Sequence, residues 1–300
     1  MKIKKVLEIY LKDLQVQRYS TQTIRNYRII LEAFTSHLEG EGIEEIEDIT
    51  ATSIRAYIGS KGQNKASYVN GIIKRIKVFC KWCITEEYID RDPSAKVRML
   101  REEKVVLTIF NDTEMKQLLE HYNGSDYLSV RNRTILYILC EVGLRALEIC
   151  KLKVDSLKGD YILVHGKGNK ERIVPISNIL RKQLGRYFKV REKFARGEEW
   201  LFLSRRHKQL TTQSIEVVVK EAGRFCTIRE DIRCSPHDIR HYYAISSLKR
   251  GIGLFELSKL LGHESVTITQ KYLRFLSDED LLELGRKGSN LGHLDMKLRP

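Results

Sequence analysis

The chain changes character at Arg91-Asp-Pro93, because proline and the residue before it both disfavour helix. Before this break, apolar residues recur at helical spacing, first after the capping residue Ser20 and again along a helix expected from Ser67. The segment after the break has no such period. We therefore predict two domains joined by a linker. Their bounds are 1–92 for the helical first domain, 93–107 for the linker, 108–285 for the second domain and 286–300 for a polar tail.

The second domain is expected to contain one small β-hairpin among helices. Tyr161–His165 and Arg172–Ile176 have the composition of short strands, and Gly166-Lys-Gly-Asn169 joins them as a turn with Lys167 near its tip. This turn is not a P-loop, because a strand rather than a helix follows it. The predicted fold class is therefore mainly α with a small β-sheet, in which a helical N-terminal domain precedes an α+β domain.

Turn and capping residues predict where several helices of the second domain begin and end. Thr113 is expected to cap a helix over Glu114–His121. A strongly apolar helix over Val130–Cys140 should end at Gly143, which suits the left-handed position after a helix. Arg145 would then lie at a buried junction. The helix that follows it would be anchored by Leu147, Ile149 and Leu152.

The last part of this domain carries three more such signals. Ser235-Pro236 is a well-formed helix start, with serine as the cap and proline at the first helical position. Gly262 should close a helical turn, and Ser265 should cap the helix that carries Tyr272. A final amphipathic helix is expected after Ser277, where an acidic first turn precedes a short apolar face.

The balance of charge limits the kind of partner. The net charge is +14, which favours a polyanion and nucleic acid in particular. The sequence contains no run of about 18 apolar residues, so we expect no transmembrane helix. The N-terminal segment lacks the continuous apolar stretch of a secretory signal. We therefore expect a cytoplasmic protein whose partner is nucleic acid rather than a membrane surface.

Cys80-Lys-Trp-Cys83 matches the C-x-x-C pattern in form only. It lies within a predicted helix, and neither a second cysteine pair nor a histidine pair follows at zinc-ligand spacing. Reduced cysteines packed in a core are the simpler interpretation. We expect no metal site and no cofactor.

Six side chains in the second domain together supply a nucleophile, fixed positive charges, an acid and hydrogen-bond donors, which a phosphodiester transfer through a covalent enzyme intermediate needs. They are Arg145, Lys167, His237, Arg240, His263 and Tyr272. Each alone has an ordinary alternative: a lone tyrosine usually packs in a core, a turn lysine is usually solvated, and Arg145 could simply pair with Glu148. The hypothesis depends on their combination and order.

The motifs around these residues resemble those of the tyrosine recombinases of the phage-integrase and Xer type. The resemblance covers nearly the whole chain. Its segments are Gly143-Leu-Arg-Ala-Leu-Glu148, Gly166-Lys-Gly-Asn-Lys-Glu-Arg172, Pro236-His-Asp-Ile-Arg-His241, Leu261-Gly-His263 with Tyr272, and Ser67 to Ala95 in the first domain. The chain departs from the common pattern at Glu141, Val142, Tyr242, Tyr243 and Ile245, but none of these removes a catalytic group.

The resemblance implies a mechanism without metal or ATP. Tyr272 would attack the scissile phosphate to form a 3′-phosphotyrosine, while Arg145 and Arg240 bind the non-bridging oxygens. Lys167, with Lys170 as the alternative, would protonate the leaving 5′-oxygen. His237 would deprotonate or orient the tyrosine, and His263 would donate to the phosphate. Glu148 would orient its neighbours rather than react.

The same resemblance implies a homo-tetramer on two DNA sites, with the helix after Ser277 as the candidate contact between subunits. Charge and helix face suggest four backbone contacts in the first domain: Arg25, Lys65, Lys74 and Lys77. Two alternatives remain, a type IB topoisomerase that relaxes DNA and a non-cutting DNA-binding protein on the same fold. The sequence leaves open the DNA site, the biological task and the need for an accessory protein.

Overall fold

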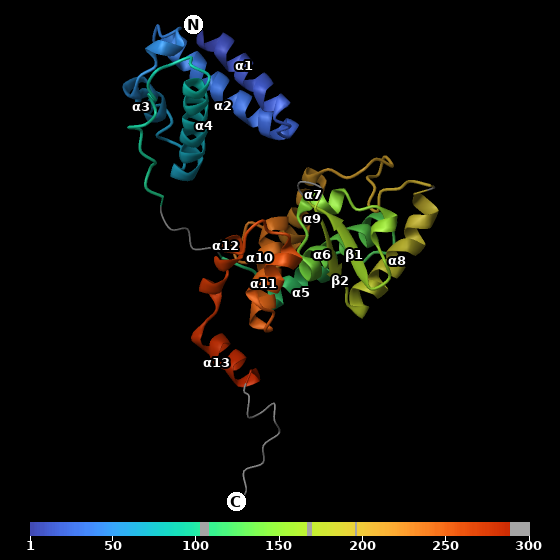
Figure 1. The fold of residues 1–300 in the computed structure, drawn as a ribbon. Helices are drawn as coiled ribbons and strands as arrows, with labels where there is room; N and C mark the ends of the chain where they lie inside the picture. The colour runs from blue at the N-terminus through green and yellow to red at the C-terminus, as the bar shows by residue number, and fades with distance from the viewer. Residues whose placement is uncertain (103–107, 167–169, 196, 289–300) are drawn as a thin grey trace, which may run out of the picture. The chain divides into compact units, whose positions relative to one another are not determined.

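The computed structural model describes residues 1–102, 108–166, 170–195 and 197–288 (Figure 1). The chain divides into two compact units, Met1–Val106 and Leu107–Pro300. Most of the described residues are helical, and one two-stranded sheet lies in the second unit. The predicted fold class is confirmed.

The first unit is a bundle of helices around one apolar core. Its elements are α1 (Ile3–Val16), α2 (Thr21–Gly40), η1 (Ile46–Asp48), α3 (Ala51–Gly59) and α4 (Ala66–Thr85). Ser20 caps α2 by accepting a hydrogen bond from the backbone N–H of Thr23, as predicted. The α4 face that contains Ile72, Ile76 and Phe79 is buried against the other helices. This burial confirms the helical period that predicted it.

The segment predicted as a linker is held against the first unit as far as Glu102. The Asn70 amide on α4 donates to the Leu100 carbonyl and the Glu102 carboxylate, and its oxygen accepts the Leu100 N–H at 2.7 Å. Lys77 donates to the Ser94 carbonyl at 2.8 Å. Hydrogen bonds therefore hold this segment to α4 at Ser94, Leu100 and Glu102, and Ser94 is fully buried.

The second unit places a β-hairpin among helices that share one core. Strand β1 (Tyr161–His165) pairs antiparallel with β2 (Glu171–Pro175), so that Val164 faces Arg172 across the ladder. The buried side chains of both strands join the core formed by α6 and α8. Figure 1 shows the two strands beside these helices. The remaining elements are α5 (Asp112–Glu120), α6 (Tyr127–Val142), α7 (Ala146–Cys150), η2 (Val154–Ser156), α8 (Asn178–Phe194), α9 (Thr212–Phe225), α10 (Pro236–Lys249), α11 (Leu254–Leu261), α12 (Thr267–Gln270), η4 (Leu273–Phe275) and α13 (Asp278–Lys287).

Two predictions about the helices of this unit are wrong, one on the cap of α5 and one on a core contact of α7. The cap of α5 is Asn111 rather than Thr113, because Asn111 accepts the Glu114 N–H while the Glu114 carboxylate accepts the Asn111 N–H. Leu147 does not anchor α7, since 53% of it is exposed, whereas Ile149 and Leu152 are buried. Leu147 and Ile149 are two positions apart on α7, so they point to different sides of the helix, and only Ile149 faces the core.

Gly143 ends α6 in the left-handed conformation that the sequence predicts, with φ +62°. A Cβ atom there would lie 2.2 Å from Cδ1 of Tyr243. We expect Gly143→Ala to lower the free energy of unfolding by about 1–2 kcal/mol for the backbone and about 1–3 kcal/mol for overpacking. Urea unfolding measures both together. Gly159→Ala is the control, because its φ is +75° and its Cβ would meet nothing within 4 Å. Equal losses in the two variants would contradict the steric argument.

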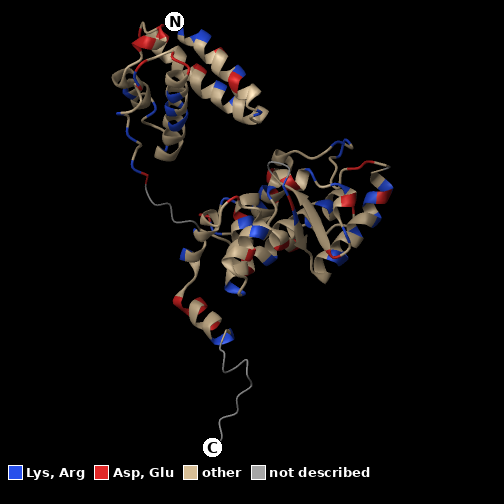
Figure 2. Cartoon of the chain, in the orientation of Figure 1, with Lys and Arg blue, Asp and Glu red and all other residues tan. Residues whose placement is uncertain are grey.

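Helix α13 has the predicted cap but buries none of its residues. Ser277 accepts the Asp280 N–H, and Asp280 pairs with Lys249 of α10 at 3.0 Å. Leu281 and Leu282 remain 53% and 61% exposed. Figure 2 shows the acidic start and the basic end of this helix, an arrangement that favours the helix dipole. In the described part of the chain, no helix is long and apolar enough to span a membrane.

Candidate active site

Arg145 stands at the turn between α6 and α7. Its backbone N–H donates to Oε2 of Glu148 at 2.8 Å, and its guanidinium donates to Oε1 of the same carboxylate at 3.1 Å. The junction around it is buried, but 44% of the Arg145 side chain is exposed. The prediction of a buried junction therefore holds for the backbone, while the guanidinium itself can reach a ligand from solvent.

Arg240 is almost fully buried on α10, with 2% exposed. Its guanidinium donates to the Gly143 carbonyl at 2.5 Å, to the Leu261 carbonyl at 2.7 Å and to Nε2 of His263 at 3.0 Å. Burial, followed by the charge of Arg145, lowers the pKa of Arg240 to about 10. Arg240 therefore remains charged at neutral pH while its fork is held by three partners.

The two arginines meet at the end of α11. Arg145 donates to the Leu261 carbonyl at 3.4 Å and to the Gly262 carbonyl at 3.3 Å, so both guanidinium groups share the oxygen of Leu261. Gly262 takes the left-handed conformation, φ +63°, that closes α11 as predicted. The Gly143 turn and the Gly262 turn thus bring two positive charges from distant parts of the sequence to one place.

His263 follows this turn and is oriented on both sides of its ring. Nε2 accepts from Arg240, so the proton is on Nδ1, which donates to the Thr269 hydroxyl at 2.7 Å. Burial and the charges of Arg240 and Arg145 lower the pKa of His263 to about 4. The imidazole is therefore neutral near pH 7.

Tyr272 lies on the turn between α12 and η4, so the prediction that it sits on the helix capped by Ser265 is wrong. Ser265 accepts the Thr267 N–H, but α12 ends at Gln270. The Tyr272 side chain is 1% exposed, and its hydroxyl lies 2.9 Å from Nδ1 of His241. Burial raises the pKa of the Tyr272 phenol, and the charge of Arg240 opposes that rise.

His241 is a site residue that the sequence motifs did not single out. It is buried, and burial together with His237 lowers its pKa to about 3. His237 is exposed, and the centroid of its ring lies 4.0 Å from that of His241. The two histidines stand four residues apart on α10, so the helical period was the signal that could have identified the second one.

The remaining predicted site residues occupy different positions. Lys167 lies outside the described residues. Lys170, the alternative acid, is exposed at the hairpin beside Glu171. Glu148 is buried at the start of α7 and binds both Arg145 and Arg172. Arg172 was part of a quoted motif but was given no role.

The buried histidines predict how stability depends on pH. Burial lowers the pKa of His241 to about 3 and that of His263 to about 4, below the usual 6.5, so the unfolded chain binds more protons between pH 6.5 and 4. Stability is therefore expected to fall as the pH drops from 7 to 5, above the range where the carboxylates titrate. The midpoint of thermal unfolding measures this. His263→Gln can keep both hydrogen bonds and should show a smaller fall; equal falls would contradict the assignment.

In the first unit, three of the four candidate DNA contacts are exposed. They are Arg25 on α2, Lys65 at the start of α4 and Lys74 on α4. Lys77 is half-buried and already donates to the Ser94 carbonyl.

Burial raises the pKa of the Cys80 thiol to about 12. Among the residues described, no cluster of three or more His, Cys, Asp or Glu could hold a metal ion.

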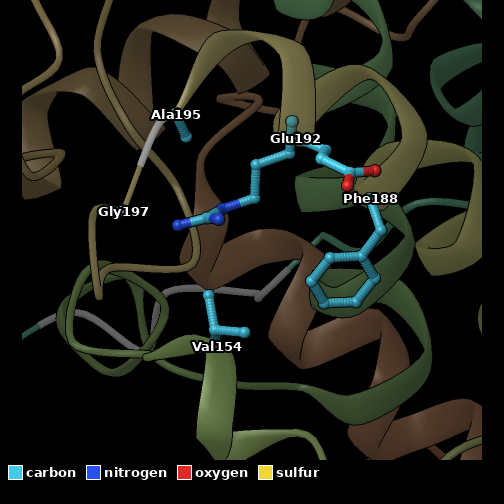
Figure 3. A pocket seen from close by; sticks show the side chains of 6 residues that line it. Val154, Phe188, Glu192, Ala195 and Gly197 are labelled. Carbon is cyan, nitrogen blue, oxygen red and sulfur yellow. The ribbon is translucent and has the colours of Figure 1, made fainter.

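None of the candidate site residues lines the pocket of about 270 Å³ that Figure 3 shows. It is lined by Val154, Phe188, Arg191, Glu192, Ala195 and Gly197. The Nε and Nη2 atoms of Arg191 donate to the carbonyls of Glu198, Trp200 and Leu201, and so they hold the loop after α8.

Comparison with known proteins identifies the family of the chain. The model of the phage integrase family matches residues 109–278, and that of the phage integrase N-terminal SAM-like domain matches residues 7–87. Tyrosine recombinase XerD of Staphylococcus haemolyticus (strain JCSC1435) is 30% identical over 89% of this chain and 92% of its own length. Tyrosine recombinase XerC of Bacillus pumilus (strain SAFR-032) is 27% identical over 91% and 93%.

Two solved structures are similar as well. The XerA recombinase is 27% identical, with a TM-score of 0.54 over 95% of this chain and 98% of XerA. A lambda integrase dimer bound to a COC′ core site is 20% identical, with a TM-score of 0.74 over 91% of this chain and 77% of that one, and shows the shared fold. The chain thus belongs to the phage integrase family and is a tyrosine-type site-specific recombinase that acts on DNA.

Proposed function

We propose that Tyr272 is the nucleophile of this recombinase. Its oxygen forms a bond to the scissile phosphorus, the bond from phosphorus to the 5′-oxygen breaks, and a 3′-phosphotyrosine remains. Lys167 supplies the proton that the 5′-oxygen takes up. The phenolic proton leaves to a histidine of α10, with His237 as the acceptor nearest the solvent. Because the phosphotyrosine keeps the bond energy, attack by a 5′-hydroxyl restores the backbone without ATP.

The observation that carries this proposal is the pair of guanidinium groups at the end of α11. Arg240 and Arg145 share the Leu261 carbonyl, and Arg145 is exposed enough to meet a phosphate from solvent. Two fixed arginines can stabilise the negative charge that develops on the non-bridging oxygens. His263 Nε2 accepts from Arg240 in this state and carries no proton. Its proposed donation to the phosphate therefore requires Arg240 to turn toward the DNA and Nε2 to take up a proton, as the phenolic proton of Tyr272 leaves or by a change of tautomer.

The burial of Tyr272 adds a step to the proposed reaction. A hydroxyl that is 1% exposed and bonded to His241 cannot touch a phosphate held at the protein surface. The short elements α12 and η4 that flank Tyr272 would have to move before cleavage. DNA binding is the event that we propose displaces Tyr272 from His241.

We further propose that the two units clamp duplex DNA and that the active assembly is a tetramer on two recombination sites in the cytoplasm. A related lambda integrase has been solved as a tetramer bound to a Holliday junction. In this chain, α13 exposes Leu281 and Leu282, and burial of these leucines against a second copy would support assembly. Arg25, Lys65 and Lys74 are the proposed contacts to the phosphate backbone.

Covalent trapping tests this function. Duplexes selected from a randomised library for tight binding are nicked near the cleavage point, so that the released fragment diffuses away. The protein should form a denaturation-resistant adduct without metal or nucleotide, and peptide mapping should place the DNA on Tyr272. Binding without an adduct would favour a non-cutting protein. Relaxation of supercoiled DNA without exchange between two sites would favour the topoisomerase alternative.

A further inference from the structure

Arg172 on β2 forms hydrogen bonds to two elements outside its hairpin, α7 and α11. Its Nη1 and Nη2 donate to the two Glu148 oxygens at 2.9 and 2.8 Å, and its Nε donates to the Leu260 carbonyl at 2.8 Å. The side chain is 11% exposed. One residue thus connects the β-hairpin with the start of α7 and with the end of α11, which packs against β2.

Gly262 leaves the space through which this connection passes. A Cβ atom at Gly262 would lie 2.8 Å from Nη1 and 3.1 Å from Cζ of Arg172. The Gly262 carbonyl meanwhile accepts from Arg145 at 3.3 Å. The glycine therefore separates two arginines that must both come close to it.

The charges explain why Glu148 needs a second partner. Glu148 binds Arg145 through both its oxygens, and with no other cation it would neutralise that arginine. Burial alone would raise the pKa of Glu148. The hydrogen bonds from Arg172 and the charge of Arg172 outweigh burial and hold this pKa below its usual range. With Arg172 present, the two arginines and one carboxylate keep a net positive charge. That charge is what Arg145 offers to a phosphate.

We propose that Arg172 is a positioning residue for DNA cleavage: it binds Glu148 so that Arg145 keeps its charge and its orientation for the scissile phosphate. This proposal rests on the proposed function of Arg145.

The chain contains a matched control for this arrangement. Arg229 binds both oxygens of Glu114 at 2.8 and 3.0 Å and the Ile109 carbonyl at 2.7 Å, and Glu114 caps α5 just as Glu148 caps α7. The two arginine–glutamate pairs make the same set of hydrogen bonds, but 48% of the Arg229 side chain is exposed, against 11% for Arg172. Among the described contacts, only the pair formed by Arg172 and Glu148 touches Arg145.

The test compares adduct formation by Arg172→Gln, Arg229→Gln, Glu148→Gln and the double variant Arg172→Gln/Glu148→Gln on the trapped duplex. Arg172→Gln should slow cleavage roughly 10²-fold, the cost of a misplaced group, while the affinity for duplex changes little. The double variant should be at least about tenfold faster than Arg172→Gln, because a neutral amide at position 148 no longer holds Arg145. Arg229→Gln should lower stability but leave the rate of the folded enzyme unchanged.

Two results would overturn the proposal: a double variant no faster than Arg172→Gln, or an equal slowing by Arg229→Gln at matched stability. A purely structural role for Arg172 would produce one of them. A second readout does not depend on cleavage. Inorganic phosphate, compared with chloride at equal ionic strength, should raise the unfolding midpoint of the wild type more than that of Arg172→Gln. The double variant Arg172→Gln/Glu148→Gln should recover the larger rise that phosphate causes in the wild type. If the wild type forms no adduct, the proposed function fails while this comparison still decides the role of Arg172.

Discussion

Tyr272→Phe is expected to abolish covalent adduct formation while leaving DNA binding and folding intact. The change removes one oxygen and keeps the ring in its apolar cluster with Leu257 and Leu261. The lost hydrogen bond to His241 costs about 1 kcal/mol of stability. The rate of cleavage should fall by roughly 10⁶-fold, the scale seen when another covalent enzyme loses its nucleophile. The measurement is the yield of protein–DNA adduct on the nicked duplex.

Tyr243→Phe is the matched control for this prediction. Tyr243 belongs to the same buried cluster, and its change to phenylalanine also removes only a hydroxyl. Its variant should form the adduct at the rate of the wild type. Adduct formation by Tyr272→Phe at a comparable rate, or mapping of the DNA to another side chain, would show that Tyr272 is not the nucleophile.

The parts of the fold that depend on neighbouring residues could be predicted from the sequence. Ser20 and Ser235 cap their helices as expected, and Gly143 and Gly262 adopt positive φ where the helices end. The strand pair around the Gly166 turn was also predicted correctly. In each case a residue with a strong local preference sits within a few positions of the element that it controls, so no tertiary information was needed.

The contacts that organise the site join residues far apart in the chain. Arg240 reaches the Gly143 carbonyl across 97 positions, Arg172 reaches Glu148 across 24, and His241 reaches Tyr272 across 31. The periodic patterns of a sequence predict contacts only between residues a few positions apart, so they do not predict contacts across such separations in the sequence. Helix α12 ends at Gln270 and a 3-10 turn follows from Leu273, so the extent of the predicted helix through Tyr272 was overestimated. The motif named the residues, but only the packing of α10 against α6 and α11 gives their geometry.

Arg240→Lys is the second change with a large expected effect, because lysine keeps the charge but loses the fork. Arg240 binds two carbonyls and His263 at once, with distances of 2.5, 2.7 and 3.0 Å. A lysine ammonium cannot span these acceptors and cannot bind two phosphate oxygens side by side. Loss of an arginine in phosphoryl transfer costs about 10³–10⁵ in rate, and we expect adduct formation to slow by at least about 10³-fold.

Arg191→Lys separates this loss of chemistry from a loss of stability. Arg191 is also buried and also donates to three backbone groups, the carbonyls of Glu198, Trp200 and Leu201, but it lies outside the candidate site. Both lysine variants leave buried carbonyls without donors, so both should unfold at lower temperature. Below those temperatures, only Arg240→Lys should cleave slowly. If the two variants cleaved equally fast when folded, charge alone would suffice at position 240, and the phosphate would be bound by Arg145 without the fork of Arg240.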